Sequence, residues 1–176
     1  MKRDLFLWQF FGYTITVLGG VLLHFLYEWS GQSRLAAPFS GVNESTWEHM
    51  KLLFFPMFVF ALVQYRYFEE YEGFWCVKLR GIIAGLVLIP VLFYTFNGSF
   101  GKSPDWLNIG FFFLAAAGAF WLETRWFKRE ASGGGNPLVA FGWIIGIGIL
   151  FVVFTFFTPQ LPLFADPLTG GYGIDL

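Results

Sequence analysis

Residues 138–158 read LVAFGWIIGIGILFVVFTFFT and contain no charged side chain. A helix that crosses a membrane needs about 20 consecutive, mostly apolar residues, so this segment is long enough to be one. The whole chain has the same character, because 56% of its 176 residues are hydrophobic and only 13% are charged, whereas charged residues make up about 25% of soluble domains. This composition excludes a soluble globular domain and a disordered chain.

Four more segments bring the number of predicted spans to five: 5–27, 47–68, 81–97 and 106–122. The charged residues of the second span, Glu48, Lys51 and Arg66, lie near its ends, where such side chains can snorkel to the interface. The first apolar run is too long for a cleaved signal peptide, and no A-x-A site follows it. We therefore predict an all-α integral membrane protein: a compact five-transmembrane-helix bundle, one membrane domain over residues 1–176, with an irregular tail at 159–176.

The distribution of Lys and Arg predicts the orientation. Cytoplasmic loops hold the excess of these residues. The N-terminus and the loops after the second and fourth spans hold eight of the 11, and the other side holds Arg34, Lys51 and Lys102. We expect the N-terminus in the cytoplasm of a bacterial cell and the tail outside. The net charge of −1 argues against a nucleic-acid partner, and the single Cys76 excludes an internal disulfide and a cysteine-built metal site.

Small residues spaced four apart predict close helix packing. Gly81 and Gly85 form one GxxxG motif, and Gly142 and Gly146 form another. Such motifs let the backbones of membrane helices approach each other. Small residues at this spacing do not identify a particular pair of helices, but four of the five spans carry them, which favours a compact bundle.

Both histidines of the chain lie near the predicted outer ends of the first two spans. His24 and Glu28 are four residues apart, so a helix presents them on one face. Glu44, Glu48 and His49 lie where the second span begins, on the same predicted side and at the same depth. We predict that the two groups of side chains meet.

These side chains suit two kinds of chemistry. Imidazole and carboxylate groups are ligands of zinc, iron and manganese, so the candidate ligands of a divalent metal such as zinc are His24, Glu28, Glu44, His49 and Asp166. The same groups act as general acids and bases, and the candidate catalytic residues are His24, Glu28, Glu48 and His49. The nature of any cofactor stays open.

A purely structural interpretation stays open beside these two. Ser45-Thr46-Trp47-Glu48 fits a capping box, in which the Ser and Glu side chains satisfy the first free amides of a helix. In that case Trp47 anchors the helix at the interface, Lys51 snorkels, and His49 lies at headgroup level.

The tail from residue 159 is too rich in Pro and Gly for a helix and too apolar for a solvated segment. We predict that it folds back over the outer mouth of the bundle and brings Asp166 towards His24 and His49, or towards Arg34. The alternative is a tail that lies along the lipid headgroups.

Three segments carry a resemblance to a known family: HFLYEW at 24–29, VNESTWEHMKL at 42–52 and PLFADPLTGGYGI at 162–174. They resemble the signatures of small bacterial multi-pass membrane proteins of unknown function. The resemblance implies a membrane location and a fold over nearly the whole chain. It implies no activity, cofactor or catalytic residue.

Three functional hypotheses remain. The first is a metal-dependent or acid–base membrane enzyme, or a binding protein, for a lipid-like or small-molecule ligand. The second is a small proton-coupled carrier or channel with His24 as its protonatable group, although we find no internal repeat and no set of polar residues deep in several spans. The third is a structural or assembly protein. Membrane lipids are expected partners in all three, and whether the protein is an enzyme and how it oligomerises stay open.

Overall fold

The computed structural model describes residues 2–129 and 135–174, and this part of the chain contains five α-helices and no β-strand. The helices are α1 (Lys2–Trp29), α2 (Thr46–Tyr65), α3 (Phe74–Phe100), α4 (Asp105–Lys128) and α5 (Pro137–Phe156), followed by a 3-10 turn, η1 (Pro162–Phe164). Each of the five helices is long and apolar enough to cross a membrane. The predicted all-α, five-helix fold class is therefore confirmed.

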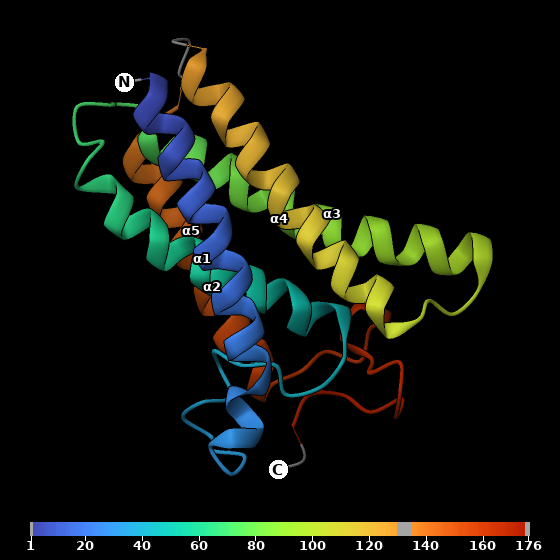
Figure 1. Cartoon of the computed structure of the whole chain (residues 1–176). Coiled ribbons are helices and arrows are strands. Elements are labelled where there is room, and N and C mark those ends of the chain that lie inside the picture. The colour runs from blue at the N-terminus through green and yellow to red at the C-terminus, as the bar shows by residue number, and fades with distance from the viewer. Residues whose placement is uncertain (1, 130–134, 175–176) are drawn as a thin grey trace.

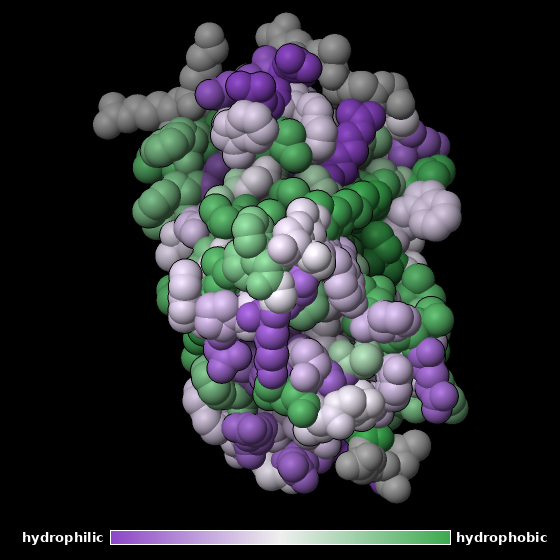
Figure 2. Space-filling view, turned by 90° about the vertical axis from the view of Figure 1, so that its right-hand side faces the viewer, coloured by the Kyte–Doolittle hydropathy of each residue, from purple (hydrophilic) through white to green (hydrophobic). Residues whose placement is uncertain are grey.

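The helices run between two ends of the molecule (Figure 1). The loop between α1 and α2, the loop between α3 and α4, and residues 159–174 lie in the lower half of the figure, and we call this the tail end. The start of α1 and the loop between α2 and α3 lie in the upper half, which we call the N-terminal end. In the face that Figure 2 shows, hydrophobic residues form a band across the middle, between more polar ends.

Only one of the two GxxxG motifs packs within the described chain. A Cβ atom on Gly81 would collide with the Glu123 side chain of α4, and one on Gly85 would lie 2.7 Å from Leu53 Cδ2 of α2. Gly142 and Gly146 of α5 have no heavy atom within 4 Å of the corresponding position. The motif on α5 therefore does not mark a contact between described helices, since spacing alone does not say which way a helix face points.

Helix α3 begins at Phe74, well before the predicted start at residue 81. The prediction excluded this turn because Lys78 and Arg80 are charged. Lys78 is buried, and its Nζ lies 2.7 Å from Glu123 Oε2 of α4. A cation that has a carboxylate partner can occupy a buried helical turn, so the helix continues through it. At the other end of the preceding loop, α2 ends at Tyr65 rather than at residue 68.

Lys51 does not snorkel, contrary to expectation. Its side chain is fully buried, and its Nζ lies 2.6 Å from Glu48 Oε2 and donates to Ala37 O and to Thr155 Oγ1 of α5. Trp47 is also buried rather than interfacial, and its ring packs 4.6 Å from that of Phe164. The start of α2 is therefore a core element that holds the first loop, α5 and the tail together.

The tail folds back onto the bundle, as predicted. Phe164 is buried against Trp47 and Phe154. The Asn43 amide nitrogen donates to Gly173 O at 3.1 Å, and Tyr94 Oη donates to Pro162 O at 3.0 Å. These contacts tie residues 162–173 to the first loop and to α3.

Candidate functional site

Three of the predicted ligands come together at the tail end of the bundle. His24 Nε2 lies 3.4 Å from Glu44 Oε1, and His49 Nε2 lies 3.7 Å from Glu44 Oε2. One ligand atom from each of the three residues lies within 4.8 Å of the others. The side chains are partly exposed, at 29% for His24, 40% for Glu44 and 21% for His49. We call these three residues the His–Glu cluster.

Local hydrogen bonds bring Glu44 of the first loop to His24 of α1. Ser40 Oγ accepts from Tyr27 N at 2.7 Å and donates to Leu23 O at 2.5 Å, and Gly41 N donates to Leu23 O at 3.3 Å. These bonds use carbonyl and amide groups near the end of α1 to hold the returning loop. The loop therefore passes beside His24 just before it reaches Glu44.

The first turn of α2 sets the position of His49. Ser45 is the N-cap residue, and its Oγ accepts from Glu48 N at 3.4 Å. His49 Nδ1 lies 2.9 Å from Ser45 O. A carbonyl oxygen can only accept a hydrogen bond, so Nδ1 carries the proton and donates it. In a neutral imidazole, Nε2 then presents its lone pair towards Glu44.

A lone pair and a carboxylate repel each other unless a cation lies between them. Either a second proton on the imidazole or a metal ion removes this repulsion. Zinc bonds of 2.0–2.2 Å to nitrogen and oxygen place tetrahedral ligand atoms about 3.4 Å apart. The distance from His24 Nε2 to Glu44 Oε1 is 3.4 Å and that from His49 Nε2 to Glu44 Oε2 is 3.7 Å, so each histidine lies close to one such separation from a different oxygen of the same carboxylate.

The His–Glu cluster forms part of the wall of a cavity of about 550 Å³. Cavities that bind small molecules typically measure about 300–1,000 Å³. Side chains from α1, α2, α3, α4, the first loop and the tail line it. The polar lining is His24, Glu44, Thr46, His49, Asn97, Lys102, Ser103, Asp105 and Asn108, and the apolar lining includes Val21, Phe25, Leu52, Ile89, Phe93, Ile109, Phe111, Phe112 and Leu168.

The other three predicted site residues do not join the cluster. Glu28 is exposed and does not line the cavity. Glu48 is buried, and its Oε2 accepts from Val42 N at 3.0 Å and pairs with Lys51. It therefore holds the loop before α2 and does not complete the predicted capping box, because Ser45 N donates to Asn43 Oδ1 instead.

Asp166 closes a turn within the tail instead of approaching the histidines or Arg34. Its Oδ1 accepts from Leu168 N, and its Oδ2 accepts from Thr169 Oγ1, both at 2.8 Å. Its neighbours Pro167 and Leu168 line the cavity. The tail thus supplies part of the cavity wall through apolar side chains rather than through a ligand.

Sequence reasoning missed the polar wall that the α3–α4 loop provides. Asn97 Nδ2 and Ser103 Oγ lie 3.1 Å apart, Ser103 N donates to Asn97 Oδ1 at 2.8 Å, and Ser103 Oγ donates to Asn108 Oδ1 at 2.6 Å. These bonds hold the loop that carries Lys102 against the cavity. The sequence did contain a signal for this wall, namely three polar residues closely spaced around one loop: Asn97, Ser103 and Asn108.

A second polar centre, also missed, lies towards the N-terminal end. Glu123 Oε2 accepts from Lys78 Nζ at 2.7 Å and from Gln9 Nε2 at 3.2 Å. Phe60, Phe74 and Phe120 surround the ammonium group, with ring centroids 5.3–5.8 Å from Nζ. We call Gln9, Lys78 and Glu123 the buried ion-pair centre. Its side chains come from α1, α3 and α4, and all three are buried inside the bundle.

No curated protein and no solved structure matches this chain. The family comparison does give a match, over residues 2–174, which include the His–Glu cluster, the cavity lining and the tail. The predicted resemblance to a family of unknown function is confirmed to that extent. The chain belongs to the family of unknown function DUF6512.

Proposed function

We propose that this protein is a membrane-embedded, metal-dependent enzyme or binding protein whose His–Glu cluster holds a divalent ion such as zinc at the wall of the cavity. Three protein ligands and a fourth position open to a cavity are the arrangement typical of catalytic zinc. At such a position, zinc polarises a bound oxygen or lowers the pKa of a bound water. We further propose a bacterial cell membrane as the location, with the tail end outside.

The observation that carries the proposal is the approach of His24 Nε2 and His49 Nε2 to the two oxygens of one carboxylate, Glu44. The bond from His49 Nδ1 to Ser45 O supports it, because metal-bound histidines usually donate their other ring nitrogen to a carbonyl or carboxylate. His24 and Glu44 reach the site from different segments, so the arrangement depends on the fold and not on one helix.

The proposed orientation rests on the charges that remain in loops and at helix ends. Lys51 and Lys78 are buried, so neither contributes to the loop count. The N-terminal end then has seven Lys and Arg residues, and the tail end has Arg34 and Lys102. The excess still favours a cytoplasmic N-terminal end. A tag after the tail that is reached by a membrane-impermeant label in intact cells would support this orientation, and a protected tag would contradict it.

Elemental analysis of purified protein tests the metal site. The protein is isolated through an affinity tag without histidines, stripped with a chelator, and reloaded with zinc. We expect one zinc per chain in the unaltered protein and a large loss in His24→Ala, Glu44→Gln and His49→Ala. Glu28→Gln is the matched control, because it removes a nearby carboxylate outside the cluster. The proposal is overturned if the unaltered protein holds no stoichiometric zinc, or if Glu28→Gln loses as much zinc as the three cluster variants.

A second candidate, a small proton-coupled carrier, is favoured by the buried ion-pair centre. Oε1 of both Gln9 and Glu123 and the amide of Gln64 are buried without a hydrogen-bond partner within the described residues, and buried groups of this kind mark proton and ion pathways in membrane proteins. Proton uptake into vesicles that depends on Glu123 but not on the His–Glu cluster would favour the carrier. If the protein neither binds metal nor moves protons, the structural or assembly role is the hypothesis that remains.

A further inference from the structure

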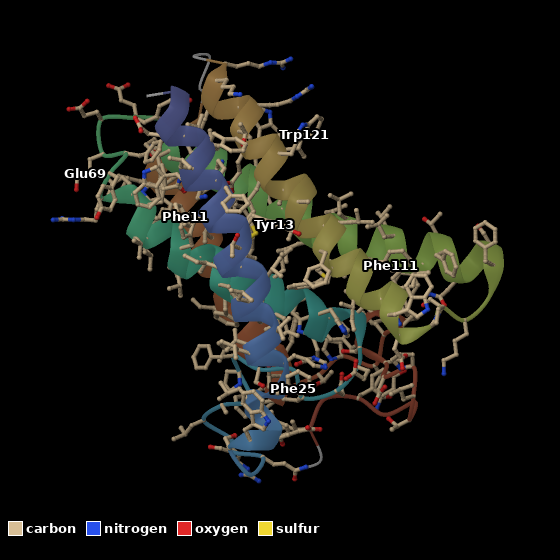
Figure 3. The ribbon with its side chains drawn as sticks, viewed as in Figure 1. Phe11, Tyr13, Phe25, Glu69, Phe111 and Trp121 are labelled. Carbon is tan, nitrogen blue, oxygen red and sulfur yellow. The ribbon has the colours of Figure 1, made fainter. Side chains whose placement is uncertain are left out.

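The cavity is amphipathic, and the exposed part of its apolar lining includes residues of α1 and α4. Val21 and Phe25 of α1 and Ile109 of α4 line it and are 41%, 40% and 53% exposed. Residues that both line a cavity and face the surrounding medium mark its opening. Phe25 of α1 and Phe111 of α4, which both line the cavity, are labelled in Figure 3.

The opening follows from where α1 and α4 touch. A Cβ atom on Gly12 would lie 2.5 Å from Phe120 Cε1, and one on Gly20 would collide with the Phe112 ring, so the helices are in close contact at these two levels. Towards the tail end, α1 and α4 diverge (Figure 1), and the cavity is lined by Val21, His24 and Phe25 of α1 and by Asn108, Ile109 and Phe112 of α4. In a membrane, the gap between them would open sideways to the hydrocarbon rather than to water alone.

The charges at the polar end select the ligand. Lys102 and Asp105 line the same cavity as the His–Glu cluster, are exposed, and carry opposite charges. A zinc ion with neutral imidazoles and an ionised Glu44 leaves the cavity with one net positive charge, because Lys102 and Asp105 offset each other and Glu44 offsets half of the charge of the ion. A metal-loaded cavity therefore favours an anionic oxygen group, which can bind the open zinc position and Lys102.

From these features we propose that the substrate or ligand is an anionic amphiphile, which enters sideways between α1 and α4. Its phosphate or carboxylate head lies between the His–Glu cluster and Lys102, and its chain lies against Phe25, Ile109 and Phe112. This inference rests on the proposed metal site. It adds the class of ligand and the route by which the ligand reaches that site.

Binding measurements on protein in phosphatidylcholine nanodiscs test the inference, with empty nanodiscs subtracted. The probes are dodecyl phosphate, inorganic phosphate and dodecanol. We expect saturable binding of dodecyl phosphate to zinc-loaded protein and at least roughly tenfold weaker binding after chelation. Equal affinity for inorganic phosphate would show a site for the free anion, and equal affinity for dodecanol would show that the head is not recognised. Either result overturns the inference.

Two pairs of variants locate the ligand. Ile109→Trp narrows the opening, and Leu114→Trp adds the same ring to an exposed position of α4 outside the cavity. Lys102→Gln removes the proposed head contact, and Arg34→Gln removes an exposed charge of the first loop. We expect roughly tenfold weaker dodecyl phosphate binding in the first member of each pair and no change in the second. Equal effects within either pair would overturn the proposed location.

The zinc content of each sample separates the two proposals. Protein that holds one zinc but does not bind dodecyl phosphate would overturn the inference about the ligand and leave the metal site intact. Protein that holds no zinc would overturn the metal site, and with it the reason for choosing an anion.

Discussion

The His–Glu cluster and the buried ion-pair centre both combine carboxylates with nitrogen groups, yet their surroundings differ. In the buried centre, Lys78 and Glu123 are at most 1% exposed and pair directly at 2.7 Å. In the cluster, Glu44 is 40% exposed, lies beside a cavity, and approaches two imidazoles at 3.4 and 3.7 Å. The first centre satisfies its own charges within the chain. In the second, the side chains are partly exposed beside a cavity, and our proposal places a cation among them.

Burial therefore separates a structural contact from a binding site more clearly than residue type does. A charge in a low-dielectric interior must have a partner in the folded chain, and Lys78 and Glu123 each have one. Side chains at a cavity can take their partner from outside. The comparison leads to three predictions, which begin with the buried centre because unpaired buried charges have the largest cost.

Lys78→Met should destabilise the fold by about 3–5 kcal/mol, since it leaves Glu123 as an uncompensated buried carboxylate. The double variant Lys78→Met, Glu123→Leu should recover most of this loss, because no charge remains buried. Unfolding curves in one detergent measure both. If Lys78→Met were as stable as the unaltered protein, the buried centre would not depend on its own ion pair, and the distinction between the two regions would be lost.

Zinc should stabilise the protein through the cluster alone. At a free concentration of about 100 times Kd, a ligand that binds only the folded state adds about 2.7 kcal/mol. We expect this gain, seen as a rise in Tm, in the unaltered protein and in the Lys78→Met, Glu123→Leu double variant, but not in His49→Ala. A gain that persists in His49→Ala would place the metal elsewhere.

Substitution of one glycine in each region tests the comparison through a smaller loss of stability. A Cβ on Gly81 would collide with the Glu123 side chain, so Gly81→Ala should cost about 1–3 kcal/mol through overpacking. A Cβ on Gly41 would lie 3.3 Å from His24 Nδ1 and 3.6 Å from Leu52 Cδ1. Gly41→Ala should therefore cost less, because the ring can shift into the cavity. Unfolding curves in the same detergent measure the stability of both variants. A larger loss of stability in Gly41→Ala would show that the cluster is the more tightly packed region.

Part of the site could be predicted from the sequence, because rare ionisable residues near the ends of apolar spans are few and conspicuous. His24, Glu44 and His49 were among them, and they meet. Glu28 was included because helical spacing places it on the face of His24, but it lies one turn farther along and is exposed. Glu48 and Asp166 were included for their charge, and local hydrogen bonds use both.

The sequence by itself determined the five apolar helices and the packed tail, since the length and hydropathy of a segment are local properties. Only the tertiary structure decided which charges pair. Lys78 finds Glu123 on the next helix, and Lys102 reaches the cavity of the histidines, whereas Lys51 pairs with Glu48 one turn away on its own helix. The physical reason is that a charge is stabilised by whatever lies within a few ångströms of it, and in this chain the helices bring distant residues to that distance.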